Sequence, residues 1–274
     1  MEQVITKLVI PGLTRSYTFF QTSDTHLSAA LETEPPEAHQ GVKEMNDNYT
    51  EIEGFPPTTA LEEALRIADE AGADGIFLCG DTAEGYSEGS VKFICDRVKQ
   101  AKTEGFCILG NHEIGNAPST KYGYEVYSEI MCGNPRFWAR DLGEIKIIGL
   151  HNANWGIKFI EEEQITFLRE QFADGKPTLL LMHAPLKLPT LVQPVVDFWG
   201  EEMREYFLLD KPENPNDPIR KFWDIIEDPE CPVMGIFTGH IHLTHEDEFA
   251  PGKKQYTICP TFRGSIRKII VSGE

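Results

Sequence analysis

Short apolar runs alternate with helical patterns along most of the chain. Eight runs have the length of a strand and are rich in β-branched and aromatic residues, and they cover residues 17–22, 76–79, 106–109, 145–150, 178–182, 233–238, 256–259 and 266–271. Three segments between them place apolar residues three and four positions apart, which gives a helix one apolar face, and they cover residues 61–68, 91–98 and 165–172. This repeated alternation predicts βαβ units and a layered α/β fold.

Local signals refine two elements. Thr59 and Glu62 have the spacing of a capping box next to the first helical pattern, so we expect that helix to begin at Thr59. Residues 1–10 hold one lysine and a short apolar run, which favours a first strand over a secretory signal.

Two acidic, proline-containing segments interrupt the alternation. Residues 31–57 hold seven acids against one lysine, and residues 184–218 hold six prolines and, from Asp197 to Asp217, seven acids against two basic residues. Together they supply eleven of the nineteen excess negative charges. We expect both to be insertions in one domain of residues 1–274, forming a solvated cap with its own small hydrophobic core. Alternatively, their aromatic residues form a rim that repels polyanions and accepts an aromatic or cationic substituent of a substrate.

The composition indicates which partners the chain can bind and in which compartment it is expected. The chain has 274 residues, 41% of them hydrophobic, and its formal net charge of −19 argues against a nucleic acid polymer or an anionic membrane as partner. No run approaches the roughly 20 apolar residues of a transmembrane helix. The six cysteines are never closer than twelve positions, so there is no C-x-x-C pattern. We therefore expect reduced cysteines, Cys132 included, and a cytoplasmic protein.

Side chains able to bind metal follow five of the predicted strands. They are Asp24, His26, Asp81, Asn111, His183, His240 and His242. Because sites in open α/β sheets form at the carboxyl ends of the strands, we expect these loops to converge. Imidazole nitrogens mixed with carboxylate and amide oxygens suit transition metals rather than an all-oxygen calcium site. Seven ligands are too many for one tetrahedral ion, so the set favours two.

The motifs, taken in order, resemble those of the calcineurin-like metallophosphoesterases. The family pattern D-x-H, G-D-x-x-x-x-G, G-N-H-[DE], H and G-H-x-H corresponds here to Asp24-Thr25-His26, Gly80-Asp81 with a closing Gly85 one position early, Gly110-Asn111-His112-Glu113, His183 and Gly239-His240-Ile241-His242. The early Gly85 leaves the ligand Asp81 intact. The resemblance spans roughly residues 17–260, and it implies a four-layer α/β/β/α sandwich with a dinuclear site.

The resemblance also implies a role for each of these residues. One ion is expected on Asp24, His26, Asp81 and His242, and the other on Asp81, Asn111, His183 and His240, with Asp81 as the bridge. Two divalent or mixed-valence ions of Mn, Fe or Zn would activate a bridging hydroxide that attacks the phosphorus. His112 would be the general acid, oriented by a hydrogen bond that Glu113 accepts.

Two residues outside these roles have open interpretations. His151 follows the strand at 145–150, where relatives often carry Asp. It is either a substrate contact or supporting residue, or a partner in local hydrogen bonds of the loop. Arg263 follows the strand at 256–259, and it either clamps a phosphate or lies at the surface.

These observations predict an enzyme that hydrolyses a small phosphodiester, similar to the bacterial cyclic nucleotide phosphodiesterase group. The motifs do not separate diesters from monoesters, so a phosphomonoesterase or a protein phosphatase is the alternative. A non-catalytic binding scaffold on the same fold is the alternative from another class.

Overall fold

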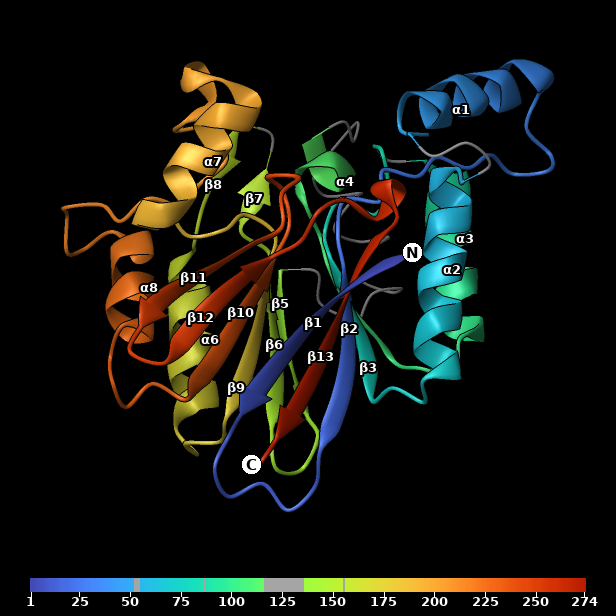
Figure 1. Ribbon diagram of the computed structural model, residues 1–274. Coiled ribbons are helices and arrows are strands. Elements are labelled where there is room, and N and C mark those ends of the chain that lie inside the picture. The colour runs from blue at the N-terminus through green and yellow to red at the C-terminus, as the bar shows by residue number, and fades with distance from the viewer. Residues whose placement is uncertain (52–54, 86, 116–135, 155) are drawn as a thin grey trace.

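Strands and helices alternate along the computed structural model (Figure 1), which describes residues 1–51, 55–85, 87–115, 136–154 and 156–274. The strands are β1 (Glu2–Val9), β2 (Tyr17–Thr22), β3 (Gly75–Cys79), β4 (Gly105–Ile108), β5 (Phe137–Asp141), β6 (Lys146–Leu150), β7 (Ala153–Asn154), β8 (Ile157–Lys158), β9 (Thr178–Met182), β10 (Val233–Thr238), β11 (His245–Ala250), β12 (Lys253–Thr257) and β13 (Ser265–Ser272). The α-helices are α1 (Pro36–Asn48), α2 (Pro57–Glu70), α3 (Glu88–Gln100), α4 (Asn111–Gly115), α6 (Glu162–Phe172), α7 (Pro189–Trp199) and α8 (Pro218–Ile226), and the 3₁₀ turns are η1 (Glu201–Met203) and η2 (Thr261–Arg263).

Two mixed sheets carry the fold. The first has the strand order β1-β13-β2-β3-β4, and the second has the order β11-β12-β10-β9-β6-β5. Strands β2, β3 and β4 run parallel to one another in the first sheet, as do β6, β9 and β10 in the second. Parallel strands end at the same edge of a sheet, so each sheet gathers several strand ends in one place.

The side chains of β3 show how one strand serves two layers. Ile76 and Leu78 pack in a cluster with α2 and α3, whereas Phe77 and Cys79 pack in a cluster between the two sheets. Successive side chains of a strand point to opposite faces of its sheet, so a strand buried on both faces is apolar throughout. This explains why the central strands are continuous apolar runs in the sequence.

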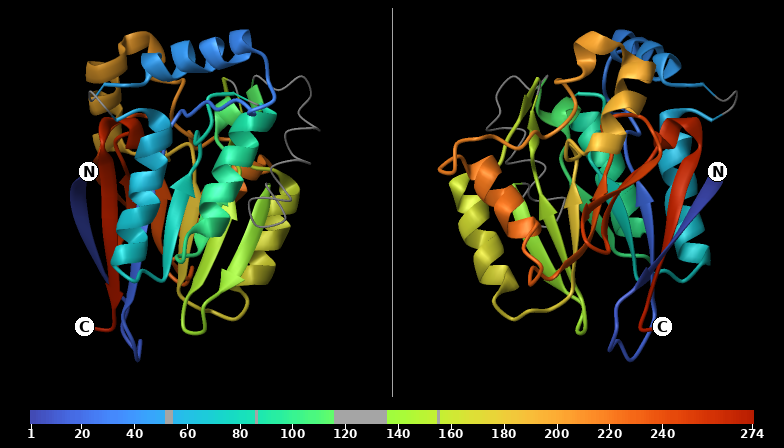
Figure 2. Two further views of the ribbon diagram at one scale, coloured as in Figure 1. Left: turned by 90° about the vertical axis from the view of Figure 1, so that its right-hand side faces the viewer. Right: turned by 60° about the vertical axis from the view of Figure 1, so that its left-hand side comes forward.

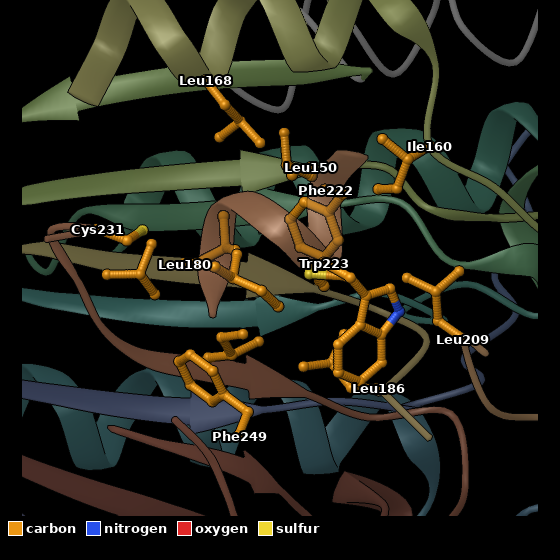
Figure 3. Packing of buried hydrophobic residues seen from close by; sticks show 14 of the residues in the cluster. Leu150, Ile160, Leu168, Leu180, Leu186, Leu209, Phe222, Trp223, Cys231 and Phe249 are labelled. Atoms are coloured by element: carbon orange, nitrogen blue, oxygen red, sulfur yellow. The ribbon is translucent and has the colours of Figure 1, made fainter. Parts of the chain in front are cut away.

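The second sheet is covered by helices on its outer face. Leu150 and Leu180 of this sheet pack against Leu168 of α6 and against Phe222 and Trp223 of α8 (Figure 3). Helices α2 and α3 cover the outer face of the first sheet, and the two sheets face each other between these helix layers (Figure 2). The predicted four-layer α/β/β/α sandwich is therefore confirmed.

The sequence patterns missed several elements and misplaced some of the boundaries. The edge strands β5 and β11 were missed because they are rich in charged residues and lack an apolar run. Charged residues are common there because one side of an edge strand faces water. The last strand of the second sheet ends at Thr257, two residues before the predicted Cys259. The capping box at Thr59 is wrong, since α2 begins at Pro57, whose ring is suited to the first turn of a helix.

Both predicted insertions contain helices that the polar composition concealed. Helix α1 lies in the first insertion, and α7 with η1 lies in the second; the two insertions stand on either side of the upper edge of the sheets, with α4 between them (Figure 1). The second insertion has a small apolar cluster of Leu191, Val195, Phe207 and Leu208, which also includes Ile241. The expected small core of the cap is thus present in this segment.

The described cysteines all have free thiols. Four of them are buried and Cys259 is half-buried, whereas Cys132 lies outside the described residues. Within the described ranges, no helix has the length and apolar character needed to cross a bilayer.

Candidate metal centre

The seven predicted metal ligands meet at the carboxyl ends of five strands. Asp24 and His26 follow β2, Asp81 follows β3 and Asn111 follows β4, all from the first sheet. The second sheet contributes His183 directly after β9, and His240 and His242 after β10. The structure therefore brings together, from residues up to 218 positions apart, the whole set that the motifs pointed to.

These side chains form two adjoining groups of ligand atoms. In the first group, His26 Nε2 lies 3.2 Å from His242 Nε2, and Asp24 Oδ1 lies 3.4 Å from His242 Nε2. In the second group, His183 Nε2 lies 3.0 Å from Asp81 Oδ2 and 3.2 Å from Asn111 Oδ1, and His240 completes the group. Two ligands that each lie about 2.1 Å from one ion are about 3.0 to 3.4 Å apart, so both groups have the spacing that a metal ion requires.

Hydrogen bonds on the far side of two imidazoles fix their tautomers. His26 Nδ1 lies 2.6 Å from a Glu84 carboxylate oxygen, and His183 Nδ1 lies 2.7 Å from the Cys79 carbonyl oxygen. Because both partners only accept, each Nδ1 carries the proton and donates it. Each Nε2 then presents a lone pair to its group, which is the arrangement typical of metal-binding histidine. The residues present therefore fit transition-metal ions.

The backbone at the site has an uncommon conformation. Among the described non-glycine residues, those with positive φ are Asp24, His26, Asp81, His240 and His242, with φ between 50° and 70°. Such a conformation costs about 1 to 3 kcal/mol per residue, and here it is confined to predicted ligands. The strained backbone therefore belongs to the residues whose side chains point into the site.

Two predicted glycines allow the close approach of these loops. A Cβ atom at Gly110 would lie 2.1 Å from Asp81 Oδ1, and one at Gly239 would lie 1.7 Å from Ser23 Oγ. Neither position has room for a side chain, because the neighbouring atoms belong to the site itself. Glycine at these two positions therefore allows the backbone to lie close to the ligand groups.

The carboxylate beside His112 belongs to a residue that the sequence motifs did not single out. His112 Nδ1 lies 2.8 Å from Glu84 Oε2, the same oxygen that accepts from His26. The predicted orienting residue, Glu113, is instead fully buried and accepts hydrogen bonds from the backbone N–H groups of residues 81, 82, 83 and 110. The role expected for Glu113 is therefore corrected, since its oxygens hold the loop after β3. Glu84 lies only three residues after Asp81, but its role depends on contacts that no spacing in the sequence reveals.

The electrostatic surroundings of His112 favour its charged form. Burial alone would lower the pKa of this ring, but the charge of Asp81 and the contact with Glu84 raise the pKa to about 9. Burial would raise the pKa of Glu84, yet its bonds to His112 and His26 lower that pKa to about 2. The carboxylate is thus ionised between two imidazoles.

The two residues with open interpretations lie in different surroundings. His151 is fully buried, and its Nδ1 lies 3.2 Å from the Leu109 carbonyl oxygen. Of the two interpretations of His151, local hydrogen bonding agrees with this contact, which joins the loops after β4 and β6, and His151 does not line the cavity described next. Arg263 lines the cavity described next, and its guanidinium makes two contacts of 2.9 Å with the Glu51 carboxylate.

A cavity of about 350 Å³ opens above the two groups of ligand atoms. Its floor includes five predicted ligands and His112, and its walls come from both insertions and from η2. The residues that line it are His26, Asn48, Tyr49, Glu51, Asp81, Asn111, His112, Trp199, Tyr206, Phe207, His240, His242, Phe262 and Arg263. The volume lies in the range of small-molecule sites.

The shared contact of Glu84 with two imidazoles leads to a first prediction. We expect Glu84→Gln to weaken manganese binding by about 10- to 100-fold, because His26 loses the charged acceptor that fixes its orientation. Elemental analysis and manganese titration measure this effect without any substrate. Glu88→Gln, at an exposed position in the first turn of α3, is the matched control. Unchanged manganese affinity in Glu84→Gln would show that this carboxylate does not support the site.

The positive φ of the ligands leads to a second prediction, for metal-free protein. At His242, with φ of 57°, we expect the glycine variant to be about 1 kcal/mol more stable than the alanine variant, because glycine adopts this conformation without strain. Urea denaturation of His242→Gly and His242→Ala gives the difference. The same pair at exposed, helical Lys92 should show the opposite order. Equal or greater stability of His242→Ala would mean that no strain resides at this position.

Comparison with known proteins places the chain in a family. Among solved structures, a dimetal phosphatase from Danio rerio is similar, with 12% identity and a TM-score of 0.53 over 90% of this chain and 88% of that one. Protein TT1561 of Thermus thermophilus is similar at 11% identity and a TM-score of 0.52, over 91% and 92% of the two chains. These likenesses concern the fold, and a comparison with curated proteins gives no match. Residues 17–243 match the sequence profile described as calcineurin-like phosphoesterase, so the chain belongs to the calcineurin-like phosphoesterase family.

Proposed function

We propose that this protein is a dinuclear metal-dependent phosphodiesterase that acts on a small substrate. The observation that carries the proposal is the pair of ligand groups on the floor of the cavity, with His112 beside them. Membership of the calcineurin-like phosphoesterases supports hydrolysis of a phosphate ester. The cavity volume of about 350 Å³ supports a substrate of small-molecule size.

The proposed reaction replaces one ester bond by a bond to water oxygen. Two bound ions, which we expect to be Mn, Fe or Zn, would supply Lewis acidity and lower the pKa of a bound water. Asp24, His26 and His242 would hold one ion, and Asn111, His183 and His240 the other, with Asp81 between them. As the water oxygen bonds to phosphorus, the P–O bond to the leaving group breaks, and His112 donates its proton to the departing oxygen.

The geometry of His112 supports its role as general acid. Its Nδ1 is engaged by Glu84, which places Nε2 on the side of the ligand groups, 3.9 Å from Asp81 Oδ2. The side chain is 17% exposed and lines the cavity. A proton on Nε2 can therefore reach the leaving group of an ester that is bound at the floor.

The charge of the chain favours a diester over a monoester. A diester carries one negative charge, whereas a monoester carries up to two, and the formal net charge of the chain is −19. Among the described residues that line the cavity, the permanent cation is Arg263, and it is already paired with Glu51. An acidic surface also repels nucleic acid polymers and acidic phosphopeptides. Together with the free thiols, these features support a cytoplasmic enzyme for small diesters.

Substrate comparison tests the proposal directly. We expect manganese-loaded protein to hydrolyse bis-p-nitrophenyl phosphate faster than p-nitrophenyl phosphate, and faster than single-stranded DNA, because both alternatives carry more negative charge. Release of p-nitrophenolate and of nucleotides measures the rates. A preference for the monoester would favour the phosphomonoesterase alternative. No hydrolysis of any ester at full metal occupancy would favour a binding scaffold.

A variant of His112 tests the proposed proton transfer. We expect His112→Ala to retain both ions but to lose at least about 100-fold in kcat for the diester, which is the usual contribution of a general acid. Metal content by elemental analysis separates this effect from a loss of ions. An unchanged kcat with full metal content would remove His112 from the mechanism.

A further inference from the structure

Five aromatic side chains surround the mouth of the cavity above the ligand groups. Trp199, Tyr206 and Phe207 come from the second insertion, Tyr49 directly follows α1 of the first insertion, and Phe262 belongs to η2. All five line the cavity. Apart from Glu51, which is paired with Arg263, the acidic insertions thus present aromatic rings to the space above the site.

The rings of the second insertion are fixed against the loop after β10. The indole of Trp199 donates from Nε1 to the Ile241 carbonyl oxygen at 2.8 Å, and its ring lies 5.4 Å from the His242 ring, centroid to centroid. Phe207 meets the His240 ring edge to face at 5.0 Å, and Tyr206 lies parallel to that ring at 6.5 Å. Rings held in this way lose little conformational freedom when a ligand stacks on them.

The opposite wall is built in the same manner. Tyr49 stacks on His26 with ring centroids 4.5 Å apart and an interplanar angle of 5°. Phe262 meets the edges of Tyr49, His26 and His242 at 5.3 to 5.9 Å. Tyr49, Trp199 and Tyr206 are only half-buried, so parts of their rings remain open to a ligand.

Aromatic rings can bind either a cationic or a neutral planar substituent, and the charged residues of the cavity decide between the two. A cationic group gains most when carboxylates accompany the rings. Here the carboxylates that line the cavity are Glu51, which is paired with Arg263, and Asp81, which contacts His183. The Arg263 guanidinium is paired in turn with Glu51, so the lining offers a cation no unpaired carboxylate of the insertions. The lining therefore favours a neutral planar group.

We propose that the substrate is a phosphodiester with one planar aromatic or heteroaromatic substituent, which stacks on the wall formed by Trp199 and Tyr206. The inference rests on the proposed function, because the phosphate of the same substrate is placed at the two groups of metal-binding side chains. The small volume of the cavity and the acidic surface disfavour a polymer as the substrate. The second insertion thus selects the substrate, while the strand ends supply the chemistry.

Equilibrium binding of matched diesters tests this selectivity. Methyl phenyl phosphate and methyl cyclohexyl phosphate carry the same charge and six-membered rings of similar size, but only the phenyl ring is planar and aromatic. Calorimetric titration of manganese-loaded protein should give a Kd at least about 10-fold lower for the phenyl ester, since stacking of a ring on an aromatic side chain contributes on this scale. A third ligand, methyl 2-(trimethylammonio)ethyl phosphate, tests the cationic alternative.

Variants then locate the selectivity on the second insertion. We expect Trp199→Leu and Tyr206→Leu each to reduce the ratio of the cyclohexyl Kd to the phenyl Kd by about 10-fold, and Trp199→Phe to restore most of it. Phe198→Leu is the matched control, because Phe198 lies next to Trp199 but does not line the cavity. Elemental analysis checks that each variant holds its ions, and the ratio cancels any common effect on phosphate binding.

The outcomes distinguish this inference from the function on which it rests. Equal affinity for the phenyl and cyclohexyl esters overturns the proposed stacking on Trp199 and Tyr206, even when bis-p-nitrophenyl phosphate is hydrolysed. The same holds if both leucine variants leave the ratio of the cyclohexyl Kd to the phenyl Kd unchanged. Tightest binding of the ammonium ester assigns the wall to a cation instead. Selective phenyl binding without hydrolysis of any phosphate ester keeps the wall and overturns the proposed function.

Discussion

The hydrogen bond between His183 Nδ1 and the Cys79 carbonyl oxygen joins the two sheets at the point where the site forms. His183 follows β9 of the second sheet, and Cys79 is the last residue of β3 in the first. The bond fixes the tautomer of a predicted ligand and also sets the position of one sheet edge against the other. Gln21 adds bonds from the first sheet to the Thr238 and Tyr256 carbonyl oxygens of the second. These bonds help to hold the two sheet edges together, and predicted ligands from both sheets lie within reach of one ion there.

How far the sequence predicts the structure depends on where the deciding contacts lie. The central strands are apolar on both faces, so runs such as 178–182 and 233–238 marked them at their observed bounds. The ligands could be predicted because each follows such a run within a short motif. Helices α1 and α7 could not, because proline and acidic residues gave α1 no buried face and α7 only a local one. Glu84 was missed because its partners, His26 and His112, are brought to it only by folding.

Backbone strain at the site lowers the stability of the fold, and contacts elsewhere in the chain must offset this loss. Five predicted ligands hold positive φ, at about 1 to 3 kcal/mol each, and their carboxylates are buried next to one another. Glu113 illustrates one compensation, since its carboxylate satisfies four backbone donors of the loops that carry Asp81 and Asn111. Burial of large rings between the sheets, such as Phe77 and Phe106, supplies stability far from the chemistry. Strain is thus local to the ligands, while the stabilising contacts are spread over the layers.

The proposed chemistry and the proposed selectivity lie on separate parts of this chain. The ligands lie on turns between elements of the sandwich, whose packing leaves little freedom, as the absence of space at Gly110 and Gly239 shows. The second insertion packs partly on a cluster of Leu191, Val195 and Leu208, which also includes Ile241 of the loop after β10. Among the described residues, its rings contact the site at the His240 and His242 rings and at the Ile241 carbonyl oxygen. We therefore expect a change in the rings of this insertion to alter ligand binding in the cavity more than it alters the two groups of predicted ligands.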